Sequence, residues 1–275
     1  DQVSGGMMTD TQYNVVTFGT PQQHVRRKEI VEMLRQSPLP AEELLLNLGL
    51  FMVPQTLSRI LFMDFLYRQI LDVQGIVMDL GTRWGQNLSL FEAMRGIYEP
   101  FNRLRKIVAF DTFEGFPHLS EEDGEGRMMS QGNYGVSNRY EEYLGALMAL
   151  LEQESPLEHI TKHEIVKGDA SIEVPAYLRR NPESIISLAY FDFDLYKPTR
   201  DCLLAMRDRF TRGSVIGFDE LNDHDCPGET LALMETLGLR NVALRRYRYN
   251  SRTSYLVIDP PPAAAYSFTD NGAAR

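Results

Sequence analysis

The chain has 275 residues, of which 43% are hydrophobic and 24% charged, as in globular proteins that bury one large core. Its formal net charge is −10 and its isoelectric point is about 5.1, which argues against nucleic acid as a partner. Two cysteines are too few for a disulfide framework, and no apolar run reaches the length of a membrane span. Because we also recognise no signal peptide, we expect a cytoplasmic protein without a membrane partner.

The N-terminal quarter is predicted to be irregular and then helical. Residues 1–24 show no periodicity, whereas residues 25–36, 40–48 and 55–71 carry apolar side chains at helical spacing. We therefore divide this part into an irregular segment, 1–24, and a helical extension or cap, 25–72. The extension either covers a cofactor or pairs subunits, and we expect a homo-oligomer.

The following residues alternate between strand and helix patterns, which indicates a parallel, doubly wound α/β sheet. The expected strands are 76–80, 106–110, 164–167, 185–191 and 215–218, and the expected helices are 85–97, 139–152, 171–180, 199–210 and 228–238. Two more β-rich runs, 242–248 and 254–258, are joined by a short polar link typical of a hairpin. A mostly parallel, seven-stranded sheet that ends in a hairpin favours a class I, Rossmann-like methyltransferase domain over residues 73–259. We expect the Pro- and Ala-rich segment 260–275 to be poorly ordered.

A long segment without periodicity, 117–138, follows the second expected strand. It contains several acids and four glycines. Loops of this length are commonly functional lids or disordered segments, and the sequence leaves both possibilities open.

Two neighbouring strands are expected to end in acidic side chains. Asp192 and Asp194 follow the apolar run that ends at Phe191, and Asp219 and Glu220 close the next strand. Carboxylates are costly to bury unless they are paired or bind a metal, and ligands of such sheets bind at the carboxyl ends of the strands. The pattern therefore predicts a divalent metal site.

Three other turns indicate a cofactor that contains adenosine. The first strand leads into a turn with Gly81 and Gly85, where the backbone can approach a ligand at a helix N-terminus. Asp111 ends the second strand, where an acid can accept both hydroxyls of a ribose. Asp169 ends the third strand and has two compatible roles, contact with an adenine amino group and the N-cap of the next helix.

Together these motifs resemble the macrocin O-methyltransferase family, metal-dependent enzymes that methylate sugar hydroxyls of antibiotics with S-adenosylmethionine. The resemblance covers roughly residues 55–258. It is carried by four motifs in this order: Asp79-x-Gly81, Phe110-Asp-Thr-Phe-Glu-Gly-Phe-Pro117, Asp192-Phe-Asp194-Leu-Tyr-x-x-Thr199 and Phe218-Asp219-Glu220. Two departures are visible, because the family usually has Asp-Asp at Asp219-Glu220 and Trp-Arg-Gly-Gly where this chain has Arg83-Trp84-Gly85-Gln86.

The resemblance implies roles for particular residues. Mg²⁺ would be bound by Asp192, Asp219 and Glu220, and Asp194 would be the general base beside Asp192. The methionine part of the cofactor would lie against Gly81, Thr82, Gly85 and Asn87, with Asp79 in the same motif. Asp111, followed by Thr112, would hold the ribose, Asp169 and Ala170 would lie near the adenine, and Asp192 would also contact the cofactor. The acceptor would be a small molecule that carries a sugar, either a glycoside or a nucleotide-linked deoxysugar.

This chemistry is reasonable from the residues themselves. A sugar hydroxyl must lose its proton before it attacks a methyl group, and carboxylate-bound Mg²⁺ keeps positions open for oxygen ligands. A carboxylate within hydrogen-bond reach can accept the proton.

Each acid also has a structural explanation. Asp192 or Asp194 could cap the helix that begins near Pro198, and Glu220 could be a surface acid. His224 is a candidate base or ligand, although a solvated loop histidine is the simpler interpretation. Trp84 is expected in the core rather than as a substrate platform.

Three competing functions remain. A haloacid-dehalogenase-like hydrolase would use Asp192 and Asp194 for phosphoryl transfer, but that family carries Asp-x-Asp on its first strand rather than its fourth. A nicotinamide oxidoreductase would need a third glycine in the first turn. A cofactor-binding protein without catalysis would leave the paired acidic strand ends unexplained.

Overall fold

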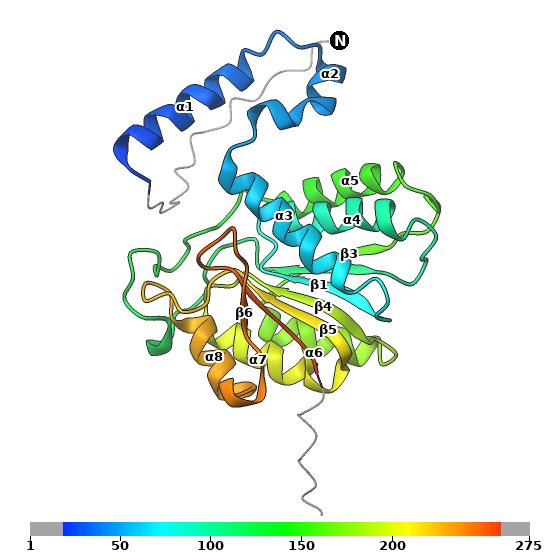
Figure 1. Cartoon of the computed structure of the whole chain (residues 1–275), viewed down its shortest axis with the longest axis vertical. Helices are drawn as coiled ribbons and strands as arrows, with labels where there is room; N and C mark the ends of the chain where they lie inside the picture. The colour runs from blue at the N-terminus through cyan, green and yellow to red at the C-terminus, as the bar shows by residue number, and fades with distance from the viewer. Residues whose placement is uncertain (1–18, 260–275) are drawn as a thin grey trace, which may run out of the picture.

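The computed structural model describes residues 19–259, so most of the segment 1–24 and the whole segment 260–275 lie outside the described residues. Seven strands form one sheet in the order β3-β2-β1-β4-β5-β7-β6 (Figure 1). Its strands are β1 Ile76–Leu80, β2 Ile107–Asp111, β3 His163–Lys167, β4 Ile186–Phe191, β5 Phe210–Phe218, β6 Arg245–Arg246 and β7 Ser254–Val257. The predicted α/β class with a mostly parallel, seven-stranded sheet is confirmed.

The pairing follows the alternation of the sequence. The five strands β1 to β5 are parallel to one another, whereas β7 is antiparallel to β5 and to β6. Every residue of β1 and β4 is buried, as expected for central strands that helices cover on both faces. Two strands differ from their predicted bounds. β5 begins five residues earlier, at Phe210, because its first residues pair beside the start of β4, and β6 is only the exposed pair Arg245–Arg246.

Helices pack on both faces of the sheet (Figure 1). One face is covered by α3 Pro54–Gln69, α4 Gln86–Tyr98 and α5 Tyr140–Glu152, and the other by α6 Ala170–Arg180, α7 Tyr196–Met206 and α8 Gly228–Thr236. Each face has its own apolar core, with Phe62, Leu66 and Phe91 on the first side and Phe110, Phe191 and Leu203 on the second. None of the helices within residues 19–259 is long and apolar enough to span a membrane.

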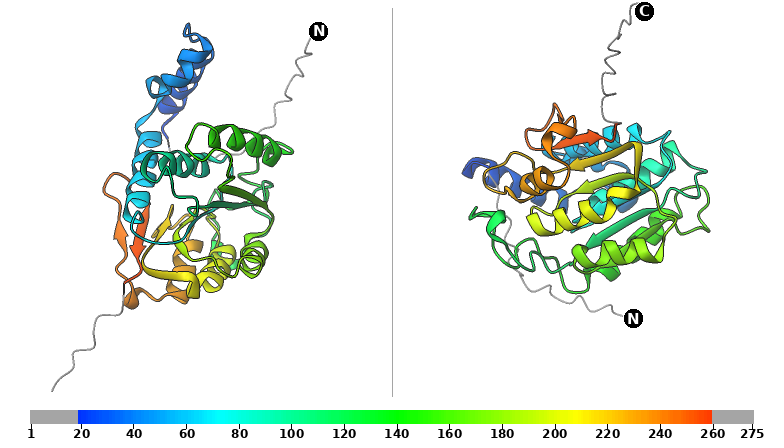
Figure 2. Two further views of the ribbon diagram at one scale, coloured as in Figure 1. Left: turned by 90° about the vertical axis from the view of Figure 1, so that its right-hand side faces the viewer. Right: turned by 90° about the horizontal axis from the view of Figure 1, so that it is seen from below.

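The N-terminal helices extend away from this body. α1 Pro21–Arg35, α2 Ala41–Leu46 and the short 3-10 helix Leu48–Phe51 have no buried residue, and they project from the start of α3 (Figure 2). α3 itself packs on the sheet through Phe62, Met63, Leu66 and Tyr67. We call α1, α2 and this 3-10 helix the N-terminal arm.

The carboxyl ends of β1 and β4 lie very close to each other. A Cβ atom added to Gly81 would lie 2.1 Å from the carbonyl oxygen of Asp192, and Gly81 has a φ of +93°. Only glycine meets both conditions. The first glycine turn is therefore held directly beside the acidic end of β4.

Candidate active site

The acids at the ends of β4 and β5 converge on one cation from the first face of the sheet. Arg59 of α3 donates from Nη1 to Asp192 Oδ2 and from Nη2 to Asp219 Oδ2, each at 2.8 Å. Tyr190, inside β4, donates its hydroxyl to the other oxygen of Asp219 at 2.6 Å. The two strand ends thus create a single position where positive charge is required.

The electrostatics of this pair show why a cation is needed. Burial and the neighbouring Asp219 raise the pKa of Asp192 to about 8, and Arg59 opposes this shift. The guanidinium benefits in turn, because the two carboxylates outweigh its burial and raise the pKa of Arg59. Two partly buried carboxylates that share one counterion need that counterion, or a replacement, to remain close together in the ionised form.

Asp194 and Glu220 form a second group next to the first. Both side chains are buried, and burial followed by contact with Glu220 raises the pKa of Asp194 well above its usual range. Glu220 accepts from Arg252 Nη2 at 2.5 Å and from the thiol of Cys226 at 3.1 Å. The structure therefore places Glu220 with Asp194, Arg252 and Cys226, and not in the contact that Asp192 and Asp219 share.

The turn that carries Asp194 is fixed by an acid from α8. Glu229 Oε1 accepts from the backbone N–H of Phe193 at 3.0 Å and of Asp194 at 3.3 Å, and the Glu229 side chain is fully buried. Asp194 has a φ of +60°, a left-handed conformation that costs free energy for a residue with a Cβ. The strain persists because Glu229 holds the turn, and it directs Asp194 toward the strand ends instead of along α7.

The glycine turn after β1 is organised from beneath by Asp79. This carboxylate is fully buried and accepts from Thr82 Oγ1 and, at 3.4 Å, from Asn87 Nδ2. Burial raises its pKa to about 6, and the hydrogen bond from Thr82 opposes the shift. Because Thr82 and Asn87 are also buried, these two side chains and Asp79 stabilise the turn between Gly81 and Gly85 and are not exposed to a ligand.

Asp111 lies at the end of β2 and closes the other side of the turn. Its carboxylate accepts from the backbone N–H of Arg83 at 2.8 Å and of Phe113 at 2.6 Å. Thr112, the next residue, donates its hydroxyl to the carbonyl of Gly115 at 2.9 Å. Asp111 is only partly buried as a residue, and its carboxylate lies beside the glycine turn.

Asp169 has the capping role that the sequence offered as one possibility. Its Oδ1 accepts from the backbone N–H of Ser171 at 2.8 Å, and Asp169 is the N-cap of α6. Ala170 is buried at the first position of that helix. Both residues therefore lie at the carboxyl end of β3, next along the same sheet edge.

The segment 117–138 packs over the acidic strand ends. Asp123 Oδ1 accepts from the backbone N–H of Tyr196 at 2.6 Å, and a Cβ on Gly126 would lie 2.0 Å from the carbonyl oxygen of Asp225. Met128, Met129 and Phe116 form an apolar cluster with Leu195 and Cys226. We call these five residues the cover cluster, and it lies beside the second acidic group because Leu195 follows Asp194 and the Cys226 thiol donates to Glu220.

Two side chains near the site differ in how well they were predicted. Trp84 is 37% exposed and meets Tyr140 edge-on, with the ring centroids 4.8 Å apart, so the prediction of a core tryptophan is wrong. It lies on the surface because the left-handed turn at Arg83 directs the next residue outward. The His224 side chain is 99% exposed and contacts Asp225, as expected for a solvated loop histidine.

Asp192 and Asp219 fit a divalent cation. Magnesium is usually bound through one or two carboxylates with water and substrate oxygens, and the pair already converges on one positive group. Glu220 does not take part in this convergence, and its role as a third ligand stays a prediction.

A different cluster has the closest set of metal-type ligands within residues 19–259. The ligand atoms of Glu92, Glu152 and His163 all lie within 4.8 Å of one another. Glu152 is also paired with Arg95 at 2.6 Å and with Lys162 at 2.7 Å, so the charge of this buried cluster is largely balanced by the chain itself. We interpret it as a structural network that joins α4, α5 and β3.

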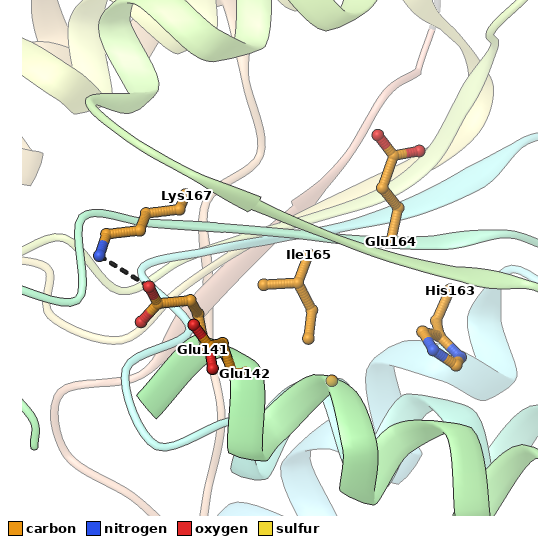
Figure 3. Close-up of a pocket in the computed structure, with 7 residues that line it drawn as sticks. Glu141, Glu142, His163, Glu164, Ile165 and Lys167 are labelled. Carbon is orange, nitrogen blue, oxygen red and sulfur yellow. Dashed lines mark hydrogen bonds and ion pairs between the residues drawn. The ribbon is translucent and has the colours of Figure 1, made fainter. Parts of the chain in front are cut away.

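A shallow pocket opens next to this network, between α5 and the edge strand β3 (Figure 3). It is lined by Glu141, Glu142, Gly145, His163, Glu164, Ile165 and Lys167. Lys167 is bonded to Glu141 at 2.8 Å. The lining contains none of the acids at the ends of β4 and β5, so the pocket is separate from the candidate active site.

Sequence reasoning missed Arg59 and Glu229. Arg59 falls on the same helical face as Met63 and Leu66, so a charged residue on the buried face of α3 was an available signal. Glu229 had no such signal, since an acid in the first turn of a helix is common.

Comparisons with known proteins agree with this architecture. No family model matches the chain, and neither does any curated protein. Among solved structures, CalS11, a calicheamicin methyltransferase, is 41% identical with a TM-score of 0.85, and the match covers 88% of this chain and 94% of that one. The apo structure of CalS11, described as a TDP-rhamnose 3'-O-methyltransferase of calicheamicin biosynthesis, is 38% identical with a TM-score of 0.77 over 88% and 96%. The O-methyltransferase NovP shares the fold at 17% identity, with a TM-score of 0.56 over 73% and 79%.

Proposed function

The chain belongs to the S-adenosylmethionine-dependent O-methyltransferases of antibiotic sugars, and from this premise we propose that it methylates a deoxysugar hydroxyl with the help of Mg²⁺. The observation that carries the proposal is the convergence of Asp192 and Asp219 on one cationic position beside the glycine turn. The 38% sequence identity between this chain and a TDP-rhamnose 3'-O-methyltransferase supports a nucleotide-linked sugar as the acceptor.

Asp192 and Asp219 would hold the magnesium ion, and Glu220 would be its third protein ligand. The cofactor would bind against Gly81, Gly85 and Asp111, and the turn that carries the glycines would be shaped by Asp79, Thr82 and Asn87. Thr112 would follow Asp111 at the ribose. The adenine would lie near Asp169 and Ala170. S-adenosylmethionine supplies a methyl group on a sulfonium and becomes S-adenosylhomocysteine, while Mg²⁺ supplies a Lewis acid for the hydroxyl oxygens of the acceptor.

Residues of the chain itself would remove the proton of the acceptor hydroxyl and exclude water from the site. Asp194 accepts the proton of the reacting hydroxyl at a carboxylate oxygen. Its burial beside Glu220 raises its pKa, so the ionised form is a stronger base than an exposed aspartate. The cover cluster keeps bulk water from the site, and Glu229 holds the turn that orients Asp194.

The hydrolase alternative is not favoured. Asp192 and Asp194 lie at the end of the fourth strand, and the solved structures that are 41% and 38% identical over 88% of this chain are methyltransferases. A phosphoryl-transfer enzyme that uses these two acids has no further support.

The proposal is tested by incubating the full chain with S-adenosylmethionine, Mg²⁺ and a panel of nucleotide-linked deoxysugars and glycosides. Mass spectrometry should detect an acceptor that gains one methyl group. EDTA should abolish the reaction and Mg²⁺ should restore it. Full activity in EDTA would refute the metal role, and methylation of glycosides alone would refute the nucleotide-linked acceptor.

A further inference from the structure

Arg59 occupies the position that the proposed metal ion needs. Its guanidinium uses one nitrogen for Asp192 and the other for Asp219, at 2.8 Å in both cases, and Nη1 also lies 3.5 Å from Asn87 Oδ1. The two carboxylates come from neighbouring strands, whereas Arg59 comes from α3, more than 130 residues earlier in the chain. The contact therefore joins α3 to the proposed metal site.

A guanidinium and a divalent cation cannot both occupy this position. The carboxylate oxygens that accept from Arg59 are the same ones that would bind the metal ion. A guanidinium and a divalent cation that both contact these oxygens in a partly buried site would repel each other strongly. We propose that Arg59 is a built-in counterion of Asp192 and Asp219, which a divalent metal ion displaces when it binds. The inference rests on the metal site proposed above.

Displacement of Arg59 has a structural consequence for α3. The buried residues of this helix are Phe62, Met63, Leu66 and Tyr67, all of which follow Arg59. Before Arg59, α3 is held to the body by the hydrogen bond from Ser58 Oγ to the carbonyl of Tyr249 at 3.0 Å. The N-terminal arm, which has no buried residue, directly precedes this start of α3. Metal binding therefore loosens the start of α3, residues 54–59, and the arm gains freedom of movement.

The test compares Mg²⁺ binding to the full chain and to Arg59→Gln by isothermal titration, with Mn²⁺ and electron paramagnetic resonance as a second probe. Arg59→Gln should bind the ion at least about tenfold more tightly, since the ion no longer competes with a charge-assisted hydrogen bond. Arg68→Gln is the matched control, because Arg68 lies on the same helix with a 63% exposed side chain and pairs with Asp64, away from the proposed metal site. Its affinity should equal that of the wild type. If Arg59→Gln misfolds, Arg59→Lys, which reaches one carboxylate, should give an intermediate affinity.

Hydrogen exchange separates displacement from a simple change of charge. In the wild type, Mg²⁺ should speed exchange at residues 57–60 of α3, whose backbone N–H groups are the first to make helical hydrogen bonds, whereas in Arg59→Gln these residues should exchange fast with or without the ion. Equal affinities in wild type and Arg59→Gln, or an α3 whose exchange ignores Mg²⁺, would overturn the counterion role and leave the metal site standing. An ion that binds only to Arg59→Gln would support the competition. No binding to either protein would overturn both proposals.

Discussion

Asp194 combines three properties that rarely occur together in one side chain. It is buried, it has a left-handed backbone, and it lies against a second carboxyl group, Glu220. Asp tolerates a positive φ better than most residues, and strain of this kind persists where the surrounding structure enforces it. Here Glu229 enforces it through two backbone N–H groups. The geometry is unnecessary for a simple helix cap, and the structure records no such cap, since α7 begins after Leu195 without a side-chain hydrogen bond.

Replacing this carboxylate tests the proton transfer. Asp194→Asn keeps the shape and should bind S-adenosylhomocysteine with wild-type affinity, but turnover should fall by about 10² to 10⁴ because no base remains. Asp208→Asn, at an 86% exposed side chain, is the control and should be fully active. Near-normal turnover of Asp194→Asn would show that the base lies elsewhere.

His163 provides a test of stability against pH. Burial lowers its pKa, but hydrogen bonds and charge from Glu92 and Glu152 outweigh burial, so the pKa is raised in the folded protein. A raised pKa stabilises the fold below the unfolded value of about 6.5, and the stabilisation is lost as the pH rises through the folded value.

His163→Gln should therefore lose more stability relative to wild type at about pH 5.5 than at about pH 8.5. Urea unfolding at the two pH values measures the difference, and the exposed His159→Gln should show no such trend. A loss for His163→Gln that does not change with pH would mean that the histidine acts through packing alone.

Residue identity alone predicted the acids of the site but not their partners. Asp192 and Asp219 could be placed together because parallel strands end at one edge of the sheet. Arg59 stands out as a charged residue on the buried face of α3, but local sequence does not show that its partners are acids 133 and 160 residues later. The same holds for the separation of Glu220 from the pair, which depends on Arg252 and Cys226 from later segments.

Between elements, the approach of the β1 turn to the end of β4 is the tightest requirement. A methyl group at Gly81 would collide with the Asp192 backbone at 2.1 Å, and the φ of +93° adds strain. Gly81→Ala should destabilise the protein by about 2–4 kcal/mol and weaken S-adenosylhomocysteine binding, as measured by unfolding and titration.

Gly145 is the matched control for that substitution. It lies within α5, and an added Cβ meets nothing within 4 Å. Gly145→Ala should stabilise the protein by about 0.5–1 kcal/mol, because alanine is the better helix former. A Gly81→Ala variant as stable as wild type would contradict the close approach described here.

Arg105 is a buried side chain whose hydrogen bonds link several elements of the fold. It is 1% exposed and donates to the carbonyls of Ile70 and Val73 after α3, to Ser187 of β4 and, at 2.8 Å, to Glu99. Arg105→Met should cost about 3–5 kcal/mol, since it leaves Glu99 buried without its partner. Chemical denaturation of Arg105→Met beside the exposed Arg103→Met measures this, and equal stabilities would refute the structural role.

The order and type of the elements were predictable, whereas several of their ends were not. Hydrophobic periodicity located β1 and β4 because both are completely buried. β6 was predicted as seven residues and is the pair Arg245–Arg246, because both residues are exposed and pairing with β7, not burial, sets its length. The segment 117–138 has no period, so its packing over the acids was visible only in three dimensions.

At the scale of the whole molecule, we propose that the sheet brings Asp192 and Asp219 together to hold a divalent ion next to the cofactor turn. The net charge of −10 fits a small-molecule acceptor better than nucleic acid, whose phosphates require clustered positive charge. The N-terminal arm has no buried residue, so packing on the sheet does not fix its position. It is connected to the site through Arg59 of α3.

The most direct measurement is a crystal structure grown with Mn²⁺ and S-adenosylhomocysteine, with anomalous data collected at the manganese edge. We predict one anomalous peak between Asp192 and Asp219, within coordination distance of a carboxylate oxygen of each, with Arg59 moved away and the cofactor against Gly81. A structure in which S-adenosylhomocysteine is bound, Arg59 still bridges the two aspartates and no peak lies between them would contradict this prediction.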